Sequence, residues 1–341
     1  MSGLAKIDDV ARHAGVAPST VSYVLSGKRA ISEETRQRVL KSIQVLGYQP
    51  HAGARALASN RSNVLALFVP LRTGMHVPVI MQFAISVVTA ARQFEHDVLL
   101  LTADEGVKGL ERVAGTSLVD ALIVMDVELH DPRLPVLRAL KRPSVLIGVP
   151  DDAEGLHCID LDFAAAGAAC LDHLADLGHR RVALIGSPPE VYERETGFAT
   201  RLSTGFTDAA ARRSVAATTH PCEATPVGAK TVVAQLLDEH PDLTAVVVHN
   251  EPVVEPVLRS FAEAGREVPA DLSVVAVCPD ELAVRVTPGL TSVAIPAEEI
   301  GRMAVQAVMG LLNHPENDPN GAPTLVQPQL TVRDSTAKPR P

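Results

Sequence analysis

Small hydroxyl side chains and one tyrosine fall on one side of the uncharged segment VAPSTVSYVLSG, residues 16–27. At about 100° per residue, the period of an α-helix, one face consists of Pro18, Ser19, Ser22 and Tyr23. The opposite face holds Thr20, Val21, Val24 and Leu25. Hydroxyl and phenol groups donate and accept hydrogen bonds, so the first face suits contact with base edges in a nucleic-acid groove.

Two further helices are expected around this segment. Residues 7–14 carry apolar side chains at helical spacing, and Gly15 follows as a turn. Residues 33–46 carry another apolar stripe between the N-cap Ser32 and the stop at Gly47. Two helices joined by a tight turn, the second with an exposed polar face, form a helix-turn-helix. An ordinary three-helix bundle would show the same apolar pattern.

Charge is divided unevenly along the 341-residue chain, whose formal net charge is −9. Residues 1–62 hold nine Lys and Arg against four Asp and Glu, a net charge of +5, and the remainder carries −14. A basic N-terminal head on an acidic body is the electrostatic pattern of a protein that binds nucleic acid through that head.

Beyond residue 63, short apolar runs alternate with longer amphipathic segments. VLALFVP, DVLLLTA and ALIVMD form a first set, and RVALIG, TAVVVH and LSVVAVC repeat the pattern after residue 162. The alternation predicts two α/β lobes, each built on a mostly parallel sheet. Ligands of such sheets bind beyond the carboxyl ends of the strands. The side chains expected at these ends are those of residues 70–76, Asp126, Arg201, Asn250 and Asp280.

The sequence lacks the motifs of several classes of enzyme. The sequence has no P-loop, no Gly-x-Ser-x-Gly and no His-Glu-x-x-His, so we expect no enzyme, no cofactor and no catalytic metal. Its cysteines, which lack metal-site spacing and fit reduced thiols, are Cys158, Cys170, Cys222 and Cys278. Without a signal peptide or an apolar run of about 18 residues, a cytoplasmic location away from membranes is expected.

The segment KIDDVARHAGVAPSTVSYVLSGKRAISEETRQRVLKSIQVLGYQPHAGARALASNRS, residues 6–62, resembles the DNA-binding head and hinge of the lactose-repressor family of bacterial transcription regulators. LDHLADLGHRRVALIGS, TPGLTSV and PQLTVRDST extend the similarity over nearly the whole chain. The resemblance implies an all-α helix-turn-helix head on a two-lobed α/β core like that of periplasmic binding proteins.

The resemblance also implies a division of the chain. Residues 1–50 would form the helix-turn-helix head, 51–62 a hinge helix, and 63–341 the core for effector binding and dimerisation. The N-lobe would comprise about 63–161 and 291–323, and the C-lobe about 162–290 and 324–334.

Specific DNA contacts follow from the same comparison. The base-reading positions of the family match Pro18, Ser19 and Tyr23, whereas Thr20 and Ser22 are placed to reach phosphates. The family normally has serine at the N-cap held here by Ala17, and threonine at the first-helix cap held by Lys6.

The hinge is expected to fold only when two copies meet over the DNA minor groove. The family's leucine wedge matches Leu57, and Arg55 and Arg61 would neutralise phosphates. His51 replaces the usual asparagine.

The effector positions of the family match Arg201, Asn250 and Asp280, and Asp126 joins them as a strand-end carboxylate. The signature Arg-x-x-Gly-Phe fits Arg194 by spacing, or Arg201 with one inserted residue. The purine-repressor branch nominates Arg194 and Thr196 as well, but Arg201 is the preferred anchor. The effector would be a sugar, nucleoside or related metabolite, and the scarcity of aromatic residues leaves its identity open.

Together, these features predict a ligand-responsive repressor that binds a pseudo-palindromic operator as a homodimer, with further pairing to a tetramer left open. A stand-alone binding protein of the periplasmic type is the alternative. It would explain the lobes but requires an export signal where the basic head lies. An α/β enzyme would need a catalytic constellation at a strand end.

Overall fold

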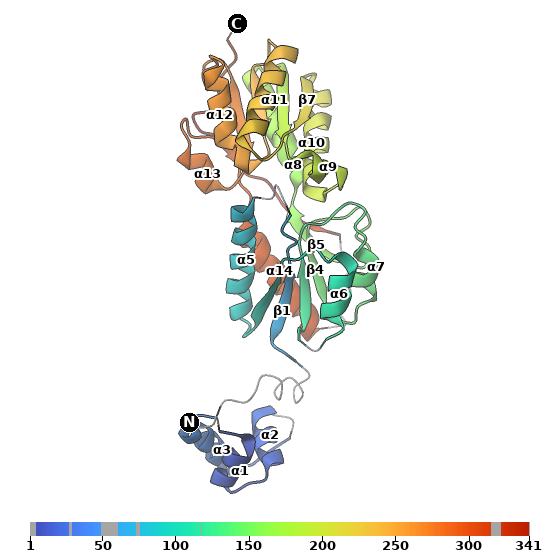
Figure 1. The fold of residues 1–341 in the computed structure, drawn as a ribbon, viewed down its shortest axis with the longest axis vertical. Helices are drawn as coiled ribbons and strands as arrows, with labels where there is room; N and C mark the ends of the chain where they lie inside the picture. The colour runs from blue at the N-terminus through green and yellow to red at the C-terminus, as the bar shows by residue number, and fades with distance from the viewer. Residues whose placement is uncertain are drawn as a thin grey trace.

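The computed structural model describes residues 5–26, 29–48, 61–72, 76–116, 118–314 and 322–340. In these ranges a head of three helices precedes two α/β lobes, which are stacked along the long axis of the molecule (Figure 1). The predicted fold class, an all-α helix-turn-helix head and a two-lobed α/β core, is confirmed.

The head contains α1 (Ile7–Ala14), α2 (Pro18–Ser26) and α3 (Glu33–Leu46). Gly15 turns the chain between α1 and α2 with φ +64°, a left-handed conformation that favours glycine. The Asp9 carboxylate accepts the backbone N–H of Lys6 at 2.9 Å, which holds the start of α1 although lysine is a poor N-cap. The helices enclose a small core of Val10, Ala11, Ala14, Val21, Val39 and Tyr48.

The first lobe is built on a parallel sheet with strand order β11-β5-β4-β3-β1-β2. Its strands are β1 (Val64–Phe68), β2 (Asp97–Leu101), β3 (Ala121–Val124), β4 (Ser144–Ile147), β5 (His157–Leu161) and β11 (Thr324–Val326). Its helices are α5 (Val77–Arg92), α6 (Gly106–Ala114), α7 (Leu134–Ala139) and α14 (Ala297–Asn313). Leu65 clusters with α5 and α14, whereas Ala66 clusters with α6 and α7. Both sheet faces are thus buried, which explains the continuous apolar runs.

The second lobe has strand order β12-β10-β9-β8-β6-β7, parallel except for the β10–β12 pair. Its strands are β6 (Arg181–Gly186), β7 (Ala216–Pro221), β8 (Ala245–Val248), β9 (Ser273–Val277), β10 (Thr291–Val293) and β12 (Leu330–Thr331). Helices α8 (Phe163–Leu177) and α10 (Gly197–Arg213) cover one face, and α11 (Pro226–Glu239) and α12 (Val254–Glu263) cover the other. The short helices are α9 (Pro189–Glu193), α13 (Asp280–Arg285) and the 3₁₀ turn η1 (Glu251–Val253).

The chain crosses between the sheets three times. Strand β5 leads through Asp162 into α8, β10 leads into α14, and β11 leads into β12. The last two crossings follow Val293 and Val326, three residues later than the expected bounds at 290 and 323. The difference arises because β10 pairs with β9 of the second sheet and β11 pairs with β5 of the first.

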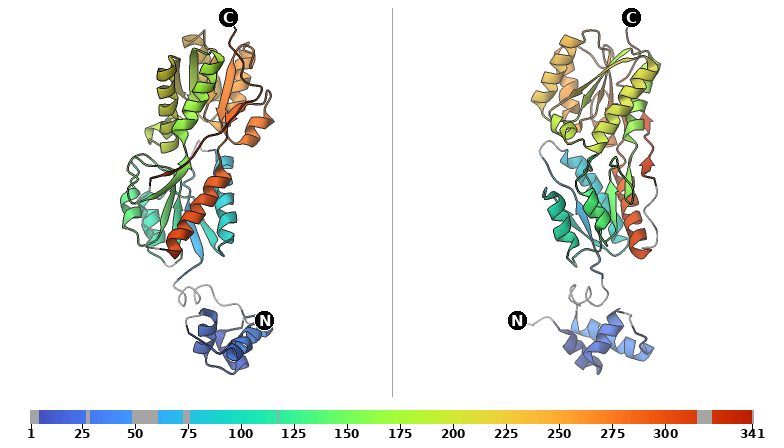
Figure 2. Two further views of the ribbon diagram at one scale, coloured as in Figure 1. Left: turned by 180° about the vertical axis from the view of Figure 1, so that it is seen from behind. Right: turned by 90° about the vertical axis from the view of Figure 1, so that its right-hand side faces the viewer.

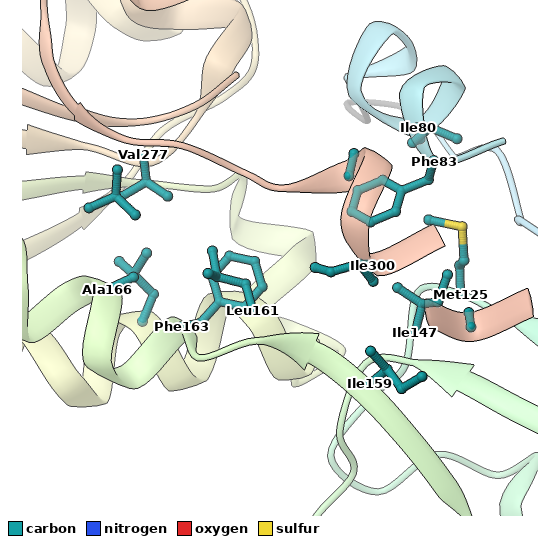
Figure 3. Close-up of a cluster of buried hydrophobic side chains, with 14 of the residues drawn as sticks. Ile80, Phe83, Met125, Ile147, Ile159, Leu161, Phe163, Ala166, Val277 and Ile300 are labelled. Atoms are coloured by element: carbon teal, nitrogen blue, oxygen red, sulfur yellow. The ribbon is translucent and has the colours of Figure 1, made fainter. Parts of the chain in front are cut away.

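One apolar cluster continues from lobe to lobe at these crossings. Figure 3 shows Phe163 and Val277 of the second lobe on one side, and Ile80, Phe83 and Ile300 of the first lobe on the other. Because protein interiors are close-packed, the two lobes change their angle only by repacking these side chains.

Helix α14 runs along the first lobe beside α5, from the second crossing toward the end of the lobe that is nearer the head (orange-red in Figure 2). The Ser86 hydroxyl of α5 donates to the Glu298 carbonyl at 2.7 Å and fixes the two helices at the start of α14. A movement at the crossing is therefore carried along the lobe by a single rigid element.

Helices α8 and α10 pack at unusually close range. A Cβ added to Gly205 of α10 would lie 1.9 Å from the Ala164 carbonyl oxygen of α8. Such a contact would force the two helices apart. This helix pair covers one face of the second sheet, and its buried side chains belong to the apolar cluster that the two lobes share.

We expect Gly205→Ala to lower the free energy of unfolding by about 1–3 kcal/mol, because overpacking outweighs the better helix propensity of alanine. Gly310→Ala in α14 is the matched control, since no heavy atom lies within 4 Å of its added Cβ. That control should be neutral or stabilising by up to about 1 kcal/mol. Denaturant midpoints measure both changes, and equal effects would contradict the close packing.

Candidate DNA-binding face and inter-lobe ligand site

The exposed face of α2 gathers the side chains expected to contact DNA. Pro18, Ser19 and Tyr23 are exposed, and Thr20 and Ser22 are half-buried. The opposite, apolar face packs into the head core and fixes α2 against α1 and α3. The contact of this face with DNA stays a prediction.

Two arginines extend this face beyond α2. The Arg29 guanidinium lies 5.8 Å from the centroid of the Tyr23 ring, within cation–π range. Arg38 of α3 lines the same hollow as Ser19, Tyr23 and Arg29, which suits contact with phosphates. In the sequence both arginines contribute to the positive charge of the head, and the basic segment 28–38 is the signal that marks them.

The predicted hinge residues Arg55 and Leu57 lie outside the described residues. Arg61 is described, and its guanidinium donates to the Asn313 side-chain oxygen and to the Leu312 carbonyl, each at 3.2 Å. Arg61 therefore contacts the C-terminal end of α14. Its phosphate contact stays a prediction.

The chain that enters β1 is clamped to the first lobe by a buried carboxylate. Asp120 accepts the Ser62 backbone N–H at 2.7 Å, the Ser62 hydroxyl at 2.9 Å and the Asn63 N–H at 2.8 Å. Together with the Arg61 contacts, these bonds attach residues 61–63 to two parts of the first lobe.

A cavity of about 160 Å³ lies between the lobes, at the carboxyl ends of strands from both sheets. Asp126 and Gly148 follow strands of the first sheet, and Ser187, His249 and Asn250 follow strands of the second. This position agrees with the strand-end rule for open α/β sheets.

Charged side chains connect the lobes at the cavity wall. Arg194, which follows α9 of the second lobe, donates to Asp126 at 3.1 Å and to Glu128 at 3.2 Å in the first lobe. Arg72 also pairs with Asp126, and it donates to Asp104 at 2.8 Å; its hydrogen bond lowers the pKa of the Asp104 carboxyl. The Arg194 pairs stabilise the contact between the lobes only while the guanidinium and the carboxylates stay within hydrogen-bonding distance.

Three rings meet at the cavity. The Phe163 centroid lies 5.7 Å from those of Phe198 and His249, and Phe198 and His249 are 5.6 Å apart, edge to face. Burial lowers the pKa of His249 to about 4, so this imidazole is neutral at pH 7. No local sequence pattern marks this aromatic surface, because its members come from three distant segments.

Several buried polar atoms beside these rings have no partner among the described residues. They include Nδ1 of His76, Nδ1 of His249 and Nε of Arg194, all from side chains that line the cavity. Thr196, fully buried at the start of α10, likewise has an unpartnered Oγ1. Because buried polar groups are normally hydrogen-bonded, these atoms indicate a place for a polar ligand.

The remaining predicted effector residues are distributed differently. Asn250 lines the cavity, where its amide donates to the carbonyls of Gly186 at 3.1 Å and Cys222 at 2.7 Å. Arg201 does not line the cavity; its guanidinium donates to the Val149 carbonyl at 3.3 Å and the Pro150 carbonyl at 3.4 Å. This arrangement argues against the preference for Arg201 as the principal anchor and favours Arg194.

Asp280 is also placed away from the cavity. It is 55% exposed and accepts a hydrogen bond from Arg333, so it forms an ion pair within the second lobe. Its predicted contact with the effector is not supported by this position. The start of α13 therefore carries a structural carboxylate.

Two carboxyl groups that sequence reasoning did not nominate line the cavity. Burial raises the pKa of Asp160 and that of Glu251 to about 7. Carboxyls that are partly protonated near neutral pH both donate and accept hydrogen bonds.

Comparison with known proteins agrees with this architecture. Residues 6–51 match the family model of bacterial regulatory proteins, lacI family, and residues 171–336 match that of the periplasmic binding protein-like domain. The transcriptional regulator CelR of Thermobifida fusca is 28% identical over 341 residues, 96% of this chain and 97% of that protein. The chain thus joins a DNA-binding head of the lacI type to a periplasmic binding protein-like domain, and the relatives that it matches are transcription regulators.

Solved structures extend the comparison to nearly the whole length. A CelR–cellobiose complex is similar with a TM-score of 0.69 and 25% identity, covering 97% of this chain and 99% of the other. The Lac repressor dimer bound to operator and the anti-inducer ONPF shares the fold at a TM-score of 0.82 and 23% identity, covering 98% and 100%. Together with the matched head, these similarities indicate a ligand-responsive transcription regulator that binds DNA. None of its described helices is long and apolar enough to span a membrane.

We expect Tyr23→Ala in this regulator to relax base preference at one or two operator positions by about 1–3 kcal/mol, because base contacts carry sequence information. Val45→Ala removes an apolar side chain that is 61% exposed on α3 and serves as the control. Sequencing of DNA selected from a random pool measures the base preference of both variants. Identical selected sites for the Tyr23 variant and the parent would refute the base contact.

Asp160 should make stability depend on pH. Because its folded-state pKa is raised from the model-compound 3.8 to about 7, its stabilising effect is complete below about pH 4 and is lost as the pH rises through 7. Relative to Asp160→Asn, the parent should lose about 1 kcal/mol or more of unfolding free energy between pH 4 and pH 8. Denaturation at several pH values tests this, with the exposed Asp208→Asn as control; parallel pH curves for the parent and Asp160→Asn would contradict it.

Proposed function

We propose that this chain is a repressor that binds a pseudo-palindromic operator as a homodimer and changes its DNA affinity when a sugar enters the inter-lobe cavity. In this proposal residues 1–50 are the DNA-reading head, 51–62 the hinge, and 63–341 the core for ligand binding and dimerisation. The observation that carries the ligand part is the set of unpartnered polar atoms beside an aromatic surface, at a cavity lined by both lobes.

A sugar matches this chemistry better than a purely apolar or purely ionic ligand. Its C–H face packs on Phe163 and Phe198, and its hydroxyls meet the nitrogen atoms of His249 and Arg194. The carboxyls of Asp160 and Glu251 supply further acceptors. The CelR relative whose structure contains cellobiose supports the same class.

The volume of the cavity limits the size of the sugar that can bind. Its volume of about 160 Å³ is below the roughly 300–1,000 Å³ of common ligand pockets. A single sugar ring is therefore favoured in the present lobe arrangement. A disaccharide requires the lobes to move apart, which would break the Arg194 contacts with Asp126 and Glu128.

Dimer formation is supported by an apolar surface on the first lobe. On the sheet face that carries α5, the exposed apolar side chains of this helix and of edge strand β2 are Val77, Met81, Ile85, Val88 and Leu100. Apolar residues gathered on one face of a water-exposed lobe favour a protein partner. We propose that two copies meet through this face, which would bring their hinges together over one operator.

We place the regulator in the cytoplasm with its DNA, and we propose that it acts by binding, without catalysis or cofactor. Its relatives are transcription regulators, which supports this reading. The alternative of a stand-alone periplasmic-type binding protein does not account for the exposed face of α2 or for the arginines beside it.

The test begins with an operator selected from random DNA, labelled and titrated with the parent protein in the presence of monosaccharides, cellobiose and nucleosides. One sugar should change the affinity for the operator. Arg194→Met should raise the sugar concentration for the half-maximal response at least about tenfold, since a charged hydrogen bond contributes roughly 1.5–3 kcal/mol.

Arg212→Met, an exposed arginine on α10, is the matched control and should respond like the parent. A larger effect of Arg201→Met than of Arg194→Met would return the anchor role to Arg201. A response to nucleosides alone would contradict the sugar as the effector. Equal affinity of the parent protein for all DNA sequences would contradict specific operator binding.

A further inference from the structure

A group of metal-ligating side chains lies at the edge of the second sheet. His220 is on edge strand β7, Glu239 is the last residue of α11, and His240 follows directly as its C-cap. One ligand atom from each of the three lies within 4.8 Å of the others. Within the described residues this is the one group of three or more His, Cys, Asp or Glu side chains with such spacing.

The local contacts show that the imidazoles are not engaged elsewhere in the described structure. Nε2 of His220 is buried and has no hydrogen-bond partner. The rings of His220 and His240 are 6.2 Å apart and nearly perpendicular, so they do not stack. Glu239 accepts a hydrogen bond from Gln235 at 2.9 Å, which orients its carboxylate from one turn earlier on α11.

Two imidazoles and one carboxylate form a donor set that suits Zn²⁺. Zinc sites with three protein ligands keep a fourth position for water, with bonds of about 2.0–2.2 Å to nitrogen and oxygen. Hard cations such as Mg²⁺ and Ca²⁺ prefer oxygen ligands alone, so two histidines select against them. Glu239 is exposed and free to approach the two rings.

We propose that His220, Glu239 and His240 bind one Zn²⁺ per chain and leave one coordination position open to solvent. The ion would tie edge strand β7 to the C-terminal end of α11, two elements of the second lobe joined by a short connection. None of the three ligands lines the inter-lobe cavity, so this site is separate from the proposed sugar site and does not depend on it.

The structure also indicates a consequence for the cavity wall. His220 lies two residues before Cys222, whose carbonyl accepts the Asn250 amide at 2.7 Å. A metal bound at His220 would restrain the end of β7 and thereby the loop that positions Asn250. The second lobe should therefore be more resistant to unfolding when zinc is bound.

Binding is tested on untagged full-length protein that has been stripped with a chelator, because a polyhistidine tag would bind zinc itself. Calorimetric titration with Zn²⁺ should give one site per chain, and the melting temperature should rise with the free zinc concentration. Glu239→Gln and His240→Gln should each weaken the site at least about tenfold, since even an outer-shell partner contributes roughly 10–100-fold.

Asp238→Asn, which removes the neighbouring exposed carboxylate of α11, is the matched control and should bind zinc like the parent. Substitution of Zn²⁺ by Co²⁺ gives a second readout. A spectrum without a thiolate charge-transfer band is expected, because all four cysteines are buried and none belongs to the site. The proposal would be overturned by a thiolate band in the Co²⁺ spectrum. It would also be overturned if both ligand variants kept the stoichiometry and affinity of the parent, or if the parent bound no zinc below millimolar concentration.

Discussion

The apolar cluster that continues through the three chain crossings is the constraint on which the rest of the core depends. Its side chains are buried against partners from both lobes, so the angle between the two sheets is set by packing as well as by three short connections. The cavity lies directly beside this cluster, and Ile80, Phe83, Met125 and Phe163 belong to both. A ligand in the cavity therefore contacts the same side chains that hold the lobes together.

Most of the fold could be predicted from the sequence because it is specified locally. The helices of the head follow from apolar spacing and from glycine stops, and the strands buried on both faces follow from continuous apolar runs. The bounds of the two later crossings could not be predicted to the residue. Strands β10 and β11 have three residues each, too few to show a period, and their sheet membership is decided by pairing with β9 and β5.

The candidate site was predictable only in part. Asp126 and Asn250 follow buried strands, and the strand-end rule placed both at the cavity. Asp280 also follows a buried strand, but its carboxylate pairs with Arg333 and does not line this cavity, so its contact with the effector stays a prediction. Spacing alone left Arg194 and Arg201 as alternatives. The surface formed by Phe163, Phe198 and His249 is assembled by tertiary packing, which no local pattern reports.

Helix α14 connects the second crossing to the contact between its C-terminal end and Arg61, which lies just before the first lobe. Its 17 residues form a rod about 25 Å long. A tilt of about 5° at the crossing would displace the far end by about 2 Å, similar to the shifts of helices in switching proteins. The rod thus amplifies a small rotation between the lobes into a displacement large enough to break a hydrogen bond of Arg61.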